Sequence, residues 1–473
     1  IKKMKYLIAL FLVLQHLSFA QEFTIKNKSH QYKIHEILSQ YIQQKSISGQ
    51  EKVAGEWLMN LCKQNGLHIT QMGHEDSNYN IAASIRPLNL GLPNIIFLNH
   101  IDVVPVGDSS KWNYPPFAGM IMDGKVWGRG AFDNKGAAMV QLASVIQAVR
   151  EYKNKDLPFN VTFLAVSCEE TQCKGGVSYV IDNHLKDLNP AVVIGEGPPG
   201  LKGILEVDTS LALFGVSVAH KRPFWLKLEL ELPTSGHGSV TPLSYSNKGM
   251  VIALSKVVSE DQPIEFIEVN TQLLKTLGKL ENGIKSSALK HPHTFKGLLV
   301  PKLRNRPEVF SLMSNTVTLT SLQSETNTVN LIPGKTTALV DCRLLPNTNR
   351  NEFLANFKRR LDNDSIKVSV VYETPPMKPS SDTTAFYRAI YKSIQVNYPG
   401  AEVIPVMMPS FNDVGLFRSK GITCYSFLPI QIDAHNVNSI KHIHNYDEFI
   451  PIKHLETGKN TYDKFVRILM KSD

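Results

Sequence analysis

Cysteine is scarce in this chain, and its pattern argues against two kinds of site. The 473 residues include five cysteines, too few for the disulfide framework of a small secreted scaffold. No CxxC pair and no Cys/His zinc-finger spacing occurs, which disfavours a cysteine-based metal site. Cys168 and Cys173 are close enough in sequence to form one disulfide bond, and the sequence alone leaves that pairing open.

Clustered basic residues are also absent, which argues against a nucleic-acid partner. Lys and Arg number 51 against 42 Asp and Glu, a formal net charge of +9. These basic residues are spread along the chain without interleaved aromatic residues, a pattern typical of a solvated basic surface. Internal repeats and low-complexity tracts are lacking too. With 42% hydrophobic residues, the chain can bury sizeable cores, and its length indicates two domains.

Long hydrophobic runs are missing apart from a short one at the beginning of the sequence. Three lysines in residues 1–5 precede the apolar residues 6–14, and residues 18–20 are suited to cleavage before Gln21. This pattern predicts a signal peptide over residues 1–20 and an exported protein, periplasmic or secreted. A transmembrane anchor is the competing interpretation, but Gln15 interrupts a run that is already short for a span. We therefore expect no membrane span after signal removal.

Three apolar segments of strand length each end in acidic or histidine residues. They cover residues 94–99, 159–166 and 191–194, and an amphipathic helical pattern over 135–152 separates the first two. Buried strands that alternate with helices predict an α/β fold, in which a mostly parallel sheet carries helices on both faces. In such sheets, ligands bind at the carboxyl ends of the strands.

The pattern changes near residue 220. Residues 225–232 alternate strictly between apolar and polar, which is typical of a half-exposed antiparallel strand. A largely helical stretch over 246–313 follows, and then alternating strands over 316–322 and 336–344. We therefore predict an inserted α+β lid or dimerisation domain over residues 221–343, within a catalytic domain formed by residues 21–220 and 344–473.

The polar residues at the strand ends predict a metal site. Two histidines and several carboxylates, one of which can bridge, suit a pair of zinc-like cations that activate water and polarise a carbonyl. In the adjacent pair Glu169 and Glu170, one side chain can ligate a metal while the other acts as a general base. Taken alone, each residue has an ordinary explanation; Asp133, for example, would cap the helix that follows it. The full set is His100, Asp102, Asp133, Glu169, Glu170, Glu196 and His444.

Four motifs in this order resemble those of the M20 family of metallopeptidases and amidohydrolases. They are residues 99–102, residues 128–136, the Glu169-Glu170 pair, and Ile443-His444 with the following Asp447-Glu448. The resemblance covers nearly the whole chain after residue 20, including the inserted lid. It implies a zinc-peptidase-like catalytic domain that holds two zinc ions (Zn²⁺), with Co²⁺ or Mn²⁺ as substitutes.

The resemblance also implies a role for each site residue. Asp133 would bridge the two metals, Asp102 would orient His100, and Glu169 would be the catalytic base. A glutamate at position 196 goes with carboxypeptidase or deacylase activity in this family, which disfavours an aminopeptidase. The metal ligands implied in this way are His100, Asp133, Glu170, Glu196 and His444.

The lid carries further residues that resemble family positions. His237 matches a histidine that stabilises the oxyanion, often from a partner subunit. Asn330 and Arg343 match lid residues that contact the substrate, and an arginine there would clamp a free carboxylate. Asn412 is also expected to bind substrate, from a turn that departs from the family pattern. Gly415 replaces an arginine found in aminoacylase-like members.

These features together predict an exported, binuclear zinc-dependent hydrolase of small substrates that carry a free carboxylate. The expected partner is a small peptide, which would make the enzyme a carboxypeptidase or dipeptidase. The alternative substrate is an N-acyl amino acid, which would make it a deacylase. A non-catalytic binding ectodomain is a third interpretation, which predicts the loss of a ligand or of the base, and neither is lost. We also expect a homodimer that forms through the lid.

Overall fold

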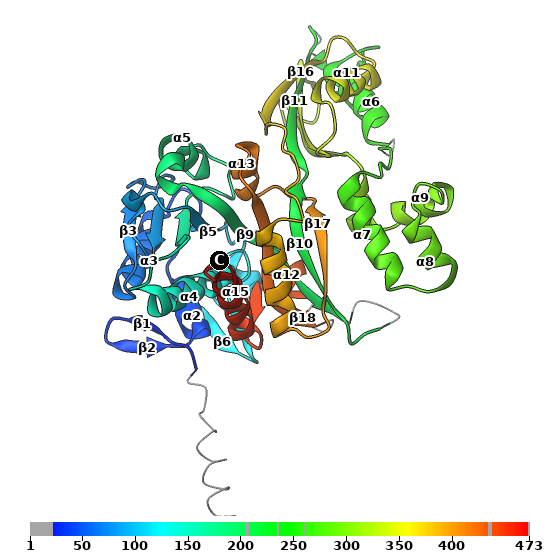
Figure 1. The fold of residues 1–473 in the computed structure, drawn as a ribbon. Helices are drawn as coiled ribbons and strands as arrows, with labels where there is room; N and C mark the ends of the chain where they lie inside the picture. The colour runs from blue at the N-terminus through cyan, green and yellow to red at the C-terminus, as the bar shows by residue number, and fades with distance from the viewer. Residues whose placement is uncertain (1–21, 204–207, 234–235, 260–261, 434–437, 472–473) are drawn as a thin grey trace, which may run out of the picture.

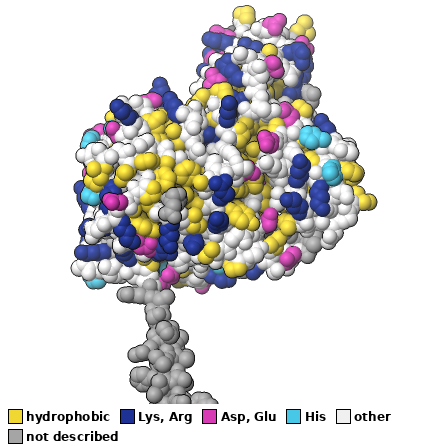
Figure 2. All heavy atoms as spheres, in the orientation of Figure 1, with side chains coloured by type: hydrophobic (Ala, Val, Ile, Leu, Met, Phe, Trp, Pro, Cys, Tyr) yellow, Lys and Arg dark blue, Asp and Glu magenta, His cyan; other side chains and the backbone are white. Residues whose placement is uncertain are grey.

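The computed structural model describes residues 22–203, 208–233, 236–259, 262–433 and 438–471. The predicted signal peptide over residues 1–20 lies outside these ranges. Within them, no helix combines the length and apolar character that a membrane span requires. Figure 2 shows Lys and Arg side chains spread over one face of the molecule and interspersed with Asp and Glu.

An eight-stranded sheet forms the larger part of the molecule (Figure 1). Its strand order is β17-β10-β18-β9-β5-β8-β4-β3. The central strand β5 pairs in parallel with β8 and β9, whereas β3 and β4 add an antiparallel edge. The predicted α/β class with a mostly parallel sheet is thus confirmed. The strands are β3 (His68–Gln71), β4 (Ile81–Ser84), β5 (Asn94–His100), β8 (Asn160–Val166), β9 (Pro190–Lys202), β10 (Ala212–His220), β17 (Glu402–Met408) and β18 (Cys424–Asp433).

Helices cover both faces of this sheet because its central strands are apolar on both sides. In β5, Ile95 and Phe97 belong to one hydrophobic core, whereas Ile96 and Leu98 belong to another on the opposite face. The first core includes residues of α2, α3, α4, α12 and α15, and the second includes residues of α5 and α13. These helices are α2 (Ile34–Gln43), α3 (Lys52–Gln64), α4 (Lys135–Tyr152), α5 (Val177–Leu188), α12 (Ala385–Asn397), α13 (Val414–Ser419) and α15 (Leu455–Leu469).

A second unit projects from the large sheet where β10 continues through Lys221 into β11 (Figure 1). Its antiparallel sheet has the order β13-β15-β11-β16, and α6 and α11 pack on it in a separate core. Because β16 pairs with β11, the lid extends past the predicted boundary at residue 343. Its elements are β11 (Arg222–Glu231), α6 (Ser246–Val258), β13 (Thr316–Ser324), β15 (Lys335–Leu344), α11 (Arg350–Leu361) and β16 (Lys367–Glu373).

Four helices between α6 and β13 form a further small core of their own. They are α7 (Glu268–Lys279), α8 (Gly283–Lys290), α9 (Lys296–Arg304) and α10 (Pro307–Met313). The remaining elements are short, and three of them, β6, β7 and β19, form a small sheet beside the candidate site loops. These elements are β1 (Ile25–Asn27), β2 (His30–Tyr32), β6 (Met120–Met122), β7 (Lys125–Trp127), β12 (Gly236–His237), β14 (Leu331–Ile332), α14 (Asn438–Lys441), β19 (Phe449–Pro451) and the two 3-10 helices η1 (Leu88–Leu90) and η2 (Ser109–Lys111).

Candidate metal centre

The carboxyl ends of β5 and β8 and the middle of the neighbouring strand β9 bring the first candidate ligands together. His100 is the last residue of β5, and its register partner Val166 ends β8. Glu169 and Glu170 follow β8 directly, and Glu196 lies within β9 on the other side of β5. Parallel strands that end at one edge of a sheet place their terminal side chains around a common crevice.

Asp133 lies between two groups of candidate ligands. Its Oδ1 atom is 3.2 Å from His100 Nε2, which is also 3.3 Å from Glu196 Oε2. Its Oδ2 atom is 3.2 Å from His444 Nε2, which is 3.1 Å from Glu170 Oε2. Each group offers three ligand atoms within 4.8 Å of one another. One carboxylate with an oxygen in each group has the arrangement of a bridging ligand.

The chemistry of these groups fits bound cations. Hydrogen bonds with Asp133 and Glu170 raise the pKa of His444 to about 10, so the carboxylates favour positive charge at this place. The Oε1 atom of Glu170 is buried and has no hydrogen-bond partner among the described residues, which leaves one carboxylate oxygen for a further ligand. Imidazole nitrogens and carboxylate oxygens are the donors that zinc and similar divalent ions accept.

Asp102 supports the candidate site in two ways. Its backbone carbonyl accepts a hydrogen bond from His100 Nδ1 at 2.9 Å, and its carboxylate Oδ1 lies 3.5 Å from the same nitrogen. The carboxylate also accepts the backbone N–H groups of Glu169 at 3.0 Å and Glu170 at 3.2 Å, and the Ser48 hydroxyl at 2.7 Å. Asp102 therefore fixes both the imidazole and the turn that carries the two glutamates.

Glu169 faces a narrow pocket beside the first ligand group. Burial, and then the negative charge of Glu196, raise the pKa of Glu169 well above its ordinary value. A carboxyl group with a raised pKa can accept and return a proton near neutral pH, which suits a general base. The pocket is lined by Leu98, Asn99, His100, Asn134, Glu169, Glu196, Asn412, Asp413 and Val414.

The predicted substrate residue Asn412 borders this pocket and also has a structural contact. Its Nδ2 atom donates a hydrogen bond to the backbone carbonyl of Glu196 at 3.1 Å, while its Oδ1 atom is buried without a partner among the described residues. The next residue, Asp413, is a site residue that the sequence did not reveal. It is buried in the same pocket, and burial raises the pKa of its carboxyl group well above the usual range.

Glu448 is a further site residue whose contacts the sequence did not reveal. Its side chain is 1% exposed and accepts hydrogen bonds from Arg129 and from the backbone N–H groups of Gly130, Phe132 and Asp133. The carboxylate thereby holds the loop that ends at Asp133. The motif around residue 444 pointed to this glutamate, but the loop that it contacts lies more than 300 residues earlier in the chain.

The predicted lid residues form two groups separate from the metal ligands. His237 is exposed, with Nδ1 2.7 Å from Ser239 Oγ and Nε2 3.3 Å from Asn330 Nδ2. Arg343 pairs with Asp341, with its Nε atom 2.8 Å from Oδ1. Among the described residues, no hydrogen bond or ion pair joins His237, Asn330 or Arg343 to the candidate metal ligands.

A different pair of residues connects the lid with the candidate site. Tyr372 on β16 donates its hydroxyl hydrogen to Gln172 Oε1 at 3.1 Å. Gln172 Nε2 in turn donates to the backbone carbonyl of Glu169 at 2.6 Å. This contact could not be predicted from the sequence, because the two side chains are 200 residues apart.

Comparisons with known proteins agree with this arrangement. The chain is similar to a probable carboxypeptidase S-like 2 of Dictyostelium discoideum, with 24% identity over 83% of this chain and 74% of that protein. It is also similar to the mouse N-fatty-acyl-amino acid synthase/hydrolase PM20D1, with 25% identity over 80% and 76% of the two chains. The fold matches the crystal structure of an M20 family metallo-carboxypeptidase from Sulfolobus solfataricus, with a TM-score of 0.70, 19% identity, and coverage of 93% and 99%.

The family model extends over most of the chain and includes the candidate centre. Residues 96–468 match the model of peptidase family M20/M25/M40. All five candidate ligands and Glu169 lie inside that range. The chain therefore belongs to the peptidase family M20/M25/M40 and is a hydrolytic enzyme of that family.

Proposed function

We propose that this enzyme is a two-zinc hydrolase that cleaves peptide or amide bonds of small substrates with a free carboxylate. The observation that carries the proposal is Asp133, whose two oxygens each lie 3.2 Å from a different histidine. One metal would be held by His100, Asp133 and Glu196, and the other by Asp133, Glu170 and His444. When bound, the two ions would polarise the scissile carbonyl and lower the pKa of a water molecule between them.

The protein residues would then move the protons of the reaction. Glu169 would accept a proton from the attacking water and return it to the leaving amine. Its raised pKa supports this role, because a carboxyl group must hold the proton between the two steps. His237 would stabilise the developing oxyanion once the lid brings it to the metals. Arg343 and Asn330 would then bind the substrate carboxylate and carbonyl.

The substrate class is also part of the proposal, and similarity to two kinds of relative supports two candidates. Similarity to a carboxypeptidase S-like protein favours a peptide substrate, and similarity to an N-fatty-acyl-amino acid synthase/hydrolase favours an N-acyl amino acid. We propose the carboxypeptidase or dipeptidase as the first choice and the deacylase as the second. We also propose export after removal of residues 1–20, on the strength of the signal-peptide pattern.

A homodimer that forms through the lid is the expected assembly. Close to His237 in sequence, Val240 and Leu243 have side chains that are 76% and 95% exposed, and Val329, next to Asn330, is fully exposed. Apolar side chains that are exposed together often mark a protein interface. Sedimentation of the purified protein would show a dimer, and substitution of Leu243 with Asp would shift it toward the monomer.

Substrate panels and one active-site variant test the proposed function. The zinc-loaded enzyme is assayed against dipeptides and against N-acyl amino acids with the same carboxy-terminal residue. Glu169→Gln should abolish turnover while metal analysis still gives about two ions per chain. If this variant stays active, Glu169 is not the base. Inactivity of the zinc-loaded wild type on both panels would instead favour a non-catalytic binding protein.

A further inference from the structure

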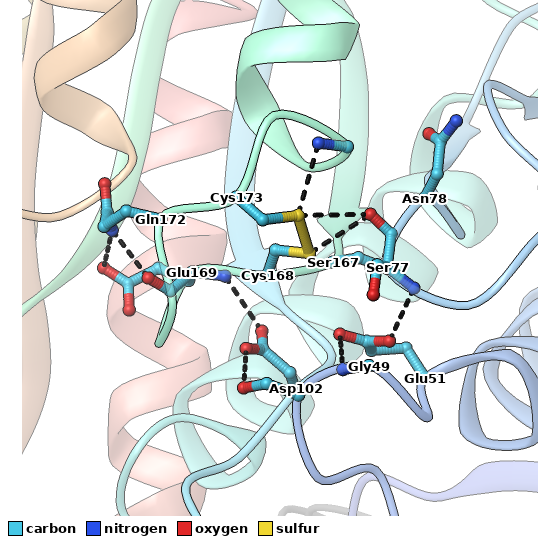
Figure 3. The surroundings of a disulfide bond; sticks show 12 residues. Gly49, Glu51, Ser77, Asn78, Asp102, Ser167, Cys168, Glu169, Gln172 and Cys173 are labelled. Carbon is cyan, nitrogen blue, oxygen red and sulfur yellow. Dashed lines mark hydrogen bonds between the residues drawn. A yellow bond between two sulfur atoms is a disulfide. The ribbon is translucent and has the colours of Figure 1, made fainter.

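A disulfide bond closes the loop that carries the proposed base. Cys168 and Cys173 are bonded, with their Cα atoms 5.4 Å apart. The closed loop contains Glu169, Glu170 and Gln172 and lies between β8 and α5 (Figure 3). Because both ends of this short segment are fixed, few backbone conformations remain open to the residues between the cysteines.

The disulfide itself lies against the backbone carbonyl of Ser77. The carbonyl oxygen of Ser77 lies 3.1 Å from the sulfur of Cys168 and 3.4 Å from that of Cys173. Ser77 is held in turn by buried Glu51, which accepts its N–H group at 2.9 Å. Figure 3 shows this carbonyl and Glu51 on the side of the disulfide away from Glu169 and Gln172. The sulfurs thus lie against the carbonyl of a residue whose own N–H group is bound by Glu51.

Within this loop, the Gln172 side chain contacts the proposed base Glu169 directly. Its Nε2 atom donates to the backbone carbonyl of Glu169 at 2.6 Å and lies 3.4 Å from the carboxylate Oε1 of the same residue. Its Oε1 atom accepts the Tyr372 hydroxyl of the lid at 3.1 Å. The Tyr372 ring packs against Trp225 on β11, with the ring centroids 4.8 Å apart. Gln172 therefore lies between the lid sheet and Glu169.

We propose that Gln172 is a positioning residue for Glu169, and that the Cys168–Cys173 disulfide holds it in place. This inference rests on the proposed function, in which Glu169 moves the proton. The amide fixes the backbone of Glu169 from one side, while Asp102 accepts the Glu169 N–H group from the other. Because Gln172 also accepts the hydroxyl group of Tyr372 on the lid, its position depends on the position of the lid. Opening the disulfide frees the loop and weakens both contacts of Gln172.

Four forms of the full-length, zinc-loaded enzyme test this inference. They are Gln172→Ala, Tyr372→Phe, the double variant of these two, and Lys174→Ala, an exposed neighbour outside the closed loop, as the matched control. We expect Gln172→Ala to lower kcat by about 10- to 100-fold, the range for a slightly misplaced catalytic group. KM should change by about twofold or less, and metal content should stay near two per chain. The two substitutions should be non-additive, because their side chains share one hydrogen bond.

Reduction tests the part played by the disulfide. A water-soluble phosphine and one water molecule convert the disulfide into two thiols and the phosphine oxide. Titration of denatured protein should then give five thiols in place of the three free cysteines. We expect the reduced wild type to lose kcat as Gln172→Ala does. A Cys168→Ser, Cys173→Ser double variant should have the same low kcat before and after phosphine treatment.

The possible results separate this inference from the proposed function. Wild-type kcat in Gln172→Ala at full metal content overturns the positioning role while the proposed function stands. A loss of kcat that only follows loss of metal overturns it too, because the loop would then act through the ligand Glu170. Unchanged activity in the reduced wild type would overturn the part played by the disulfide, because Gln172 would then keep its position without it. If the wild type has no activity on either panel, the proposed function fails, and this inference fails with it.

Discussion

Glu448→Gln tests whether a buried carboxylate holds the loop that supplies the bridging ligand. The Oε2 atom of Glu448 accepts Arg129 Nη1 at 2.8 Å and the Gly130 N–H at 3.0 Å. Its Oε1 atom accepts the N–H groups of Phe132 at 2.9 Å and Asp133 at 3.0 Å. Gly130 adopts a φ of +82°, and a Cβ atom there would come within 2.6 Å of Val103, so the loop has little freedom to rearrange.

The size of the effect follows from these four hydrogen bonds. Glutamine has nearly the shape of glutamate, but its NH₂ group would face two donors where an oxygen now accepts two hydrogen bonds. Hydrogen bonds to a charged group contribute about 1.5 to 3 kcal/mol each, and a buried cation that loses its partner costs about 3 to 5 kcal/mol. We expect the free energy of unfolding to fall by about 3 to 5 kcal/mol, a large part of the 5 to 15 kcal/mol typical of a domain.

The same substitution should weaken metal binding, because Asp133 loses the hydrogen bond that fixes its backbone. Partners that orient a metal ligand typically change metal affinity by about 10- to 100-fold. Urea unfolding followed by circular dichroism gives the stability, and competition with a chromogenic chelator gives the affinity. Glu456→Gln, at an exposed position in the first turn of α15, is the control and should change stability by less than about 1 kcal/mol. A Glu448→Gln enzyme with wild-type stability and metal affinity would refute this reasoning.

Three further perturbations have expected outcomes. Burial, followed by the charge of Arg343 and opposed by Asp341, lowers the pKa of Lys221 to about 7. The unfolded chain therefore binds a proton that the folded chain lacks between about pH 7 and 10, and the unfolding free energy should rise with pH by up to about 1.4 kcal/mol per unit. Lys221→Met should remove this rise of the unfolding free energy with pH, as measured by urea titrations. An unchanged dependence on pH would contradict the lowered pKa of Lys221. Chelation should lower the melting temperature of the zinc-loaded wild type, since cations that bind the folded state stabilise it, but should have no further effect on a His444→Ala, His100→Ala variant. Removing the Cys168–Cys173 disulfide, which closes a short loop, should lower the free energy of unfolding by about 2 kcal/mol by the chain-entropy relation. Calorimetry of the double serine variant checks this value.

Local pattern was enough to predict the elements that build the candidate centre. The apolar run that ends at His100 and the helical pattern over 135–152 correspond to β5 and α4 within a residue. Both elements are buried nearly all round, and α4 is therefore less amphipathic than its sequence pattern predicts. The predicted lid began where β11 begins, because strict apolar and polar alternation replaces the continuous apolar runs at that point.

Long-range pairing explains what the sequence did not reveal. The predicted end of the lid at residue 343 precedes β16, because β16 follows a helix, as a strand of the larger domain also would. Its pairing with β11 and the packing of Val368 and Val370 on the lid core assign it to the lid. The edge strand β17 contains Pro405, which weakens its strand pattern. Gln172 and Tyr372 likewise have ordinary local sequences, and their contact depends on how two domains meet.

The contacts of Asp102 and Glu448 point to a common way of building this centre. The ligands and the proposed base come largely from loops, which are mobile unless their backbone groups are bound. Each of these two buried carboxylates accepts backbone N–H groups of one such loop, at residues 169 and 170 or at residues 130, 132 and 133. Replacing a ligand such as His444 should therefore remove metal with little effect on the fold. Replacing either carboxylate should reduce metal binding and also the stability of the metal-free protein. A loss of stability without metal therefore distinguishes residues that shape the site from residues that bind at it.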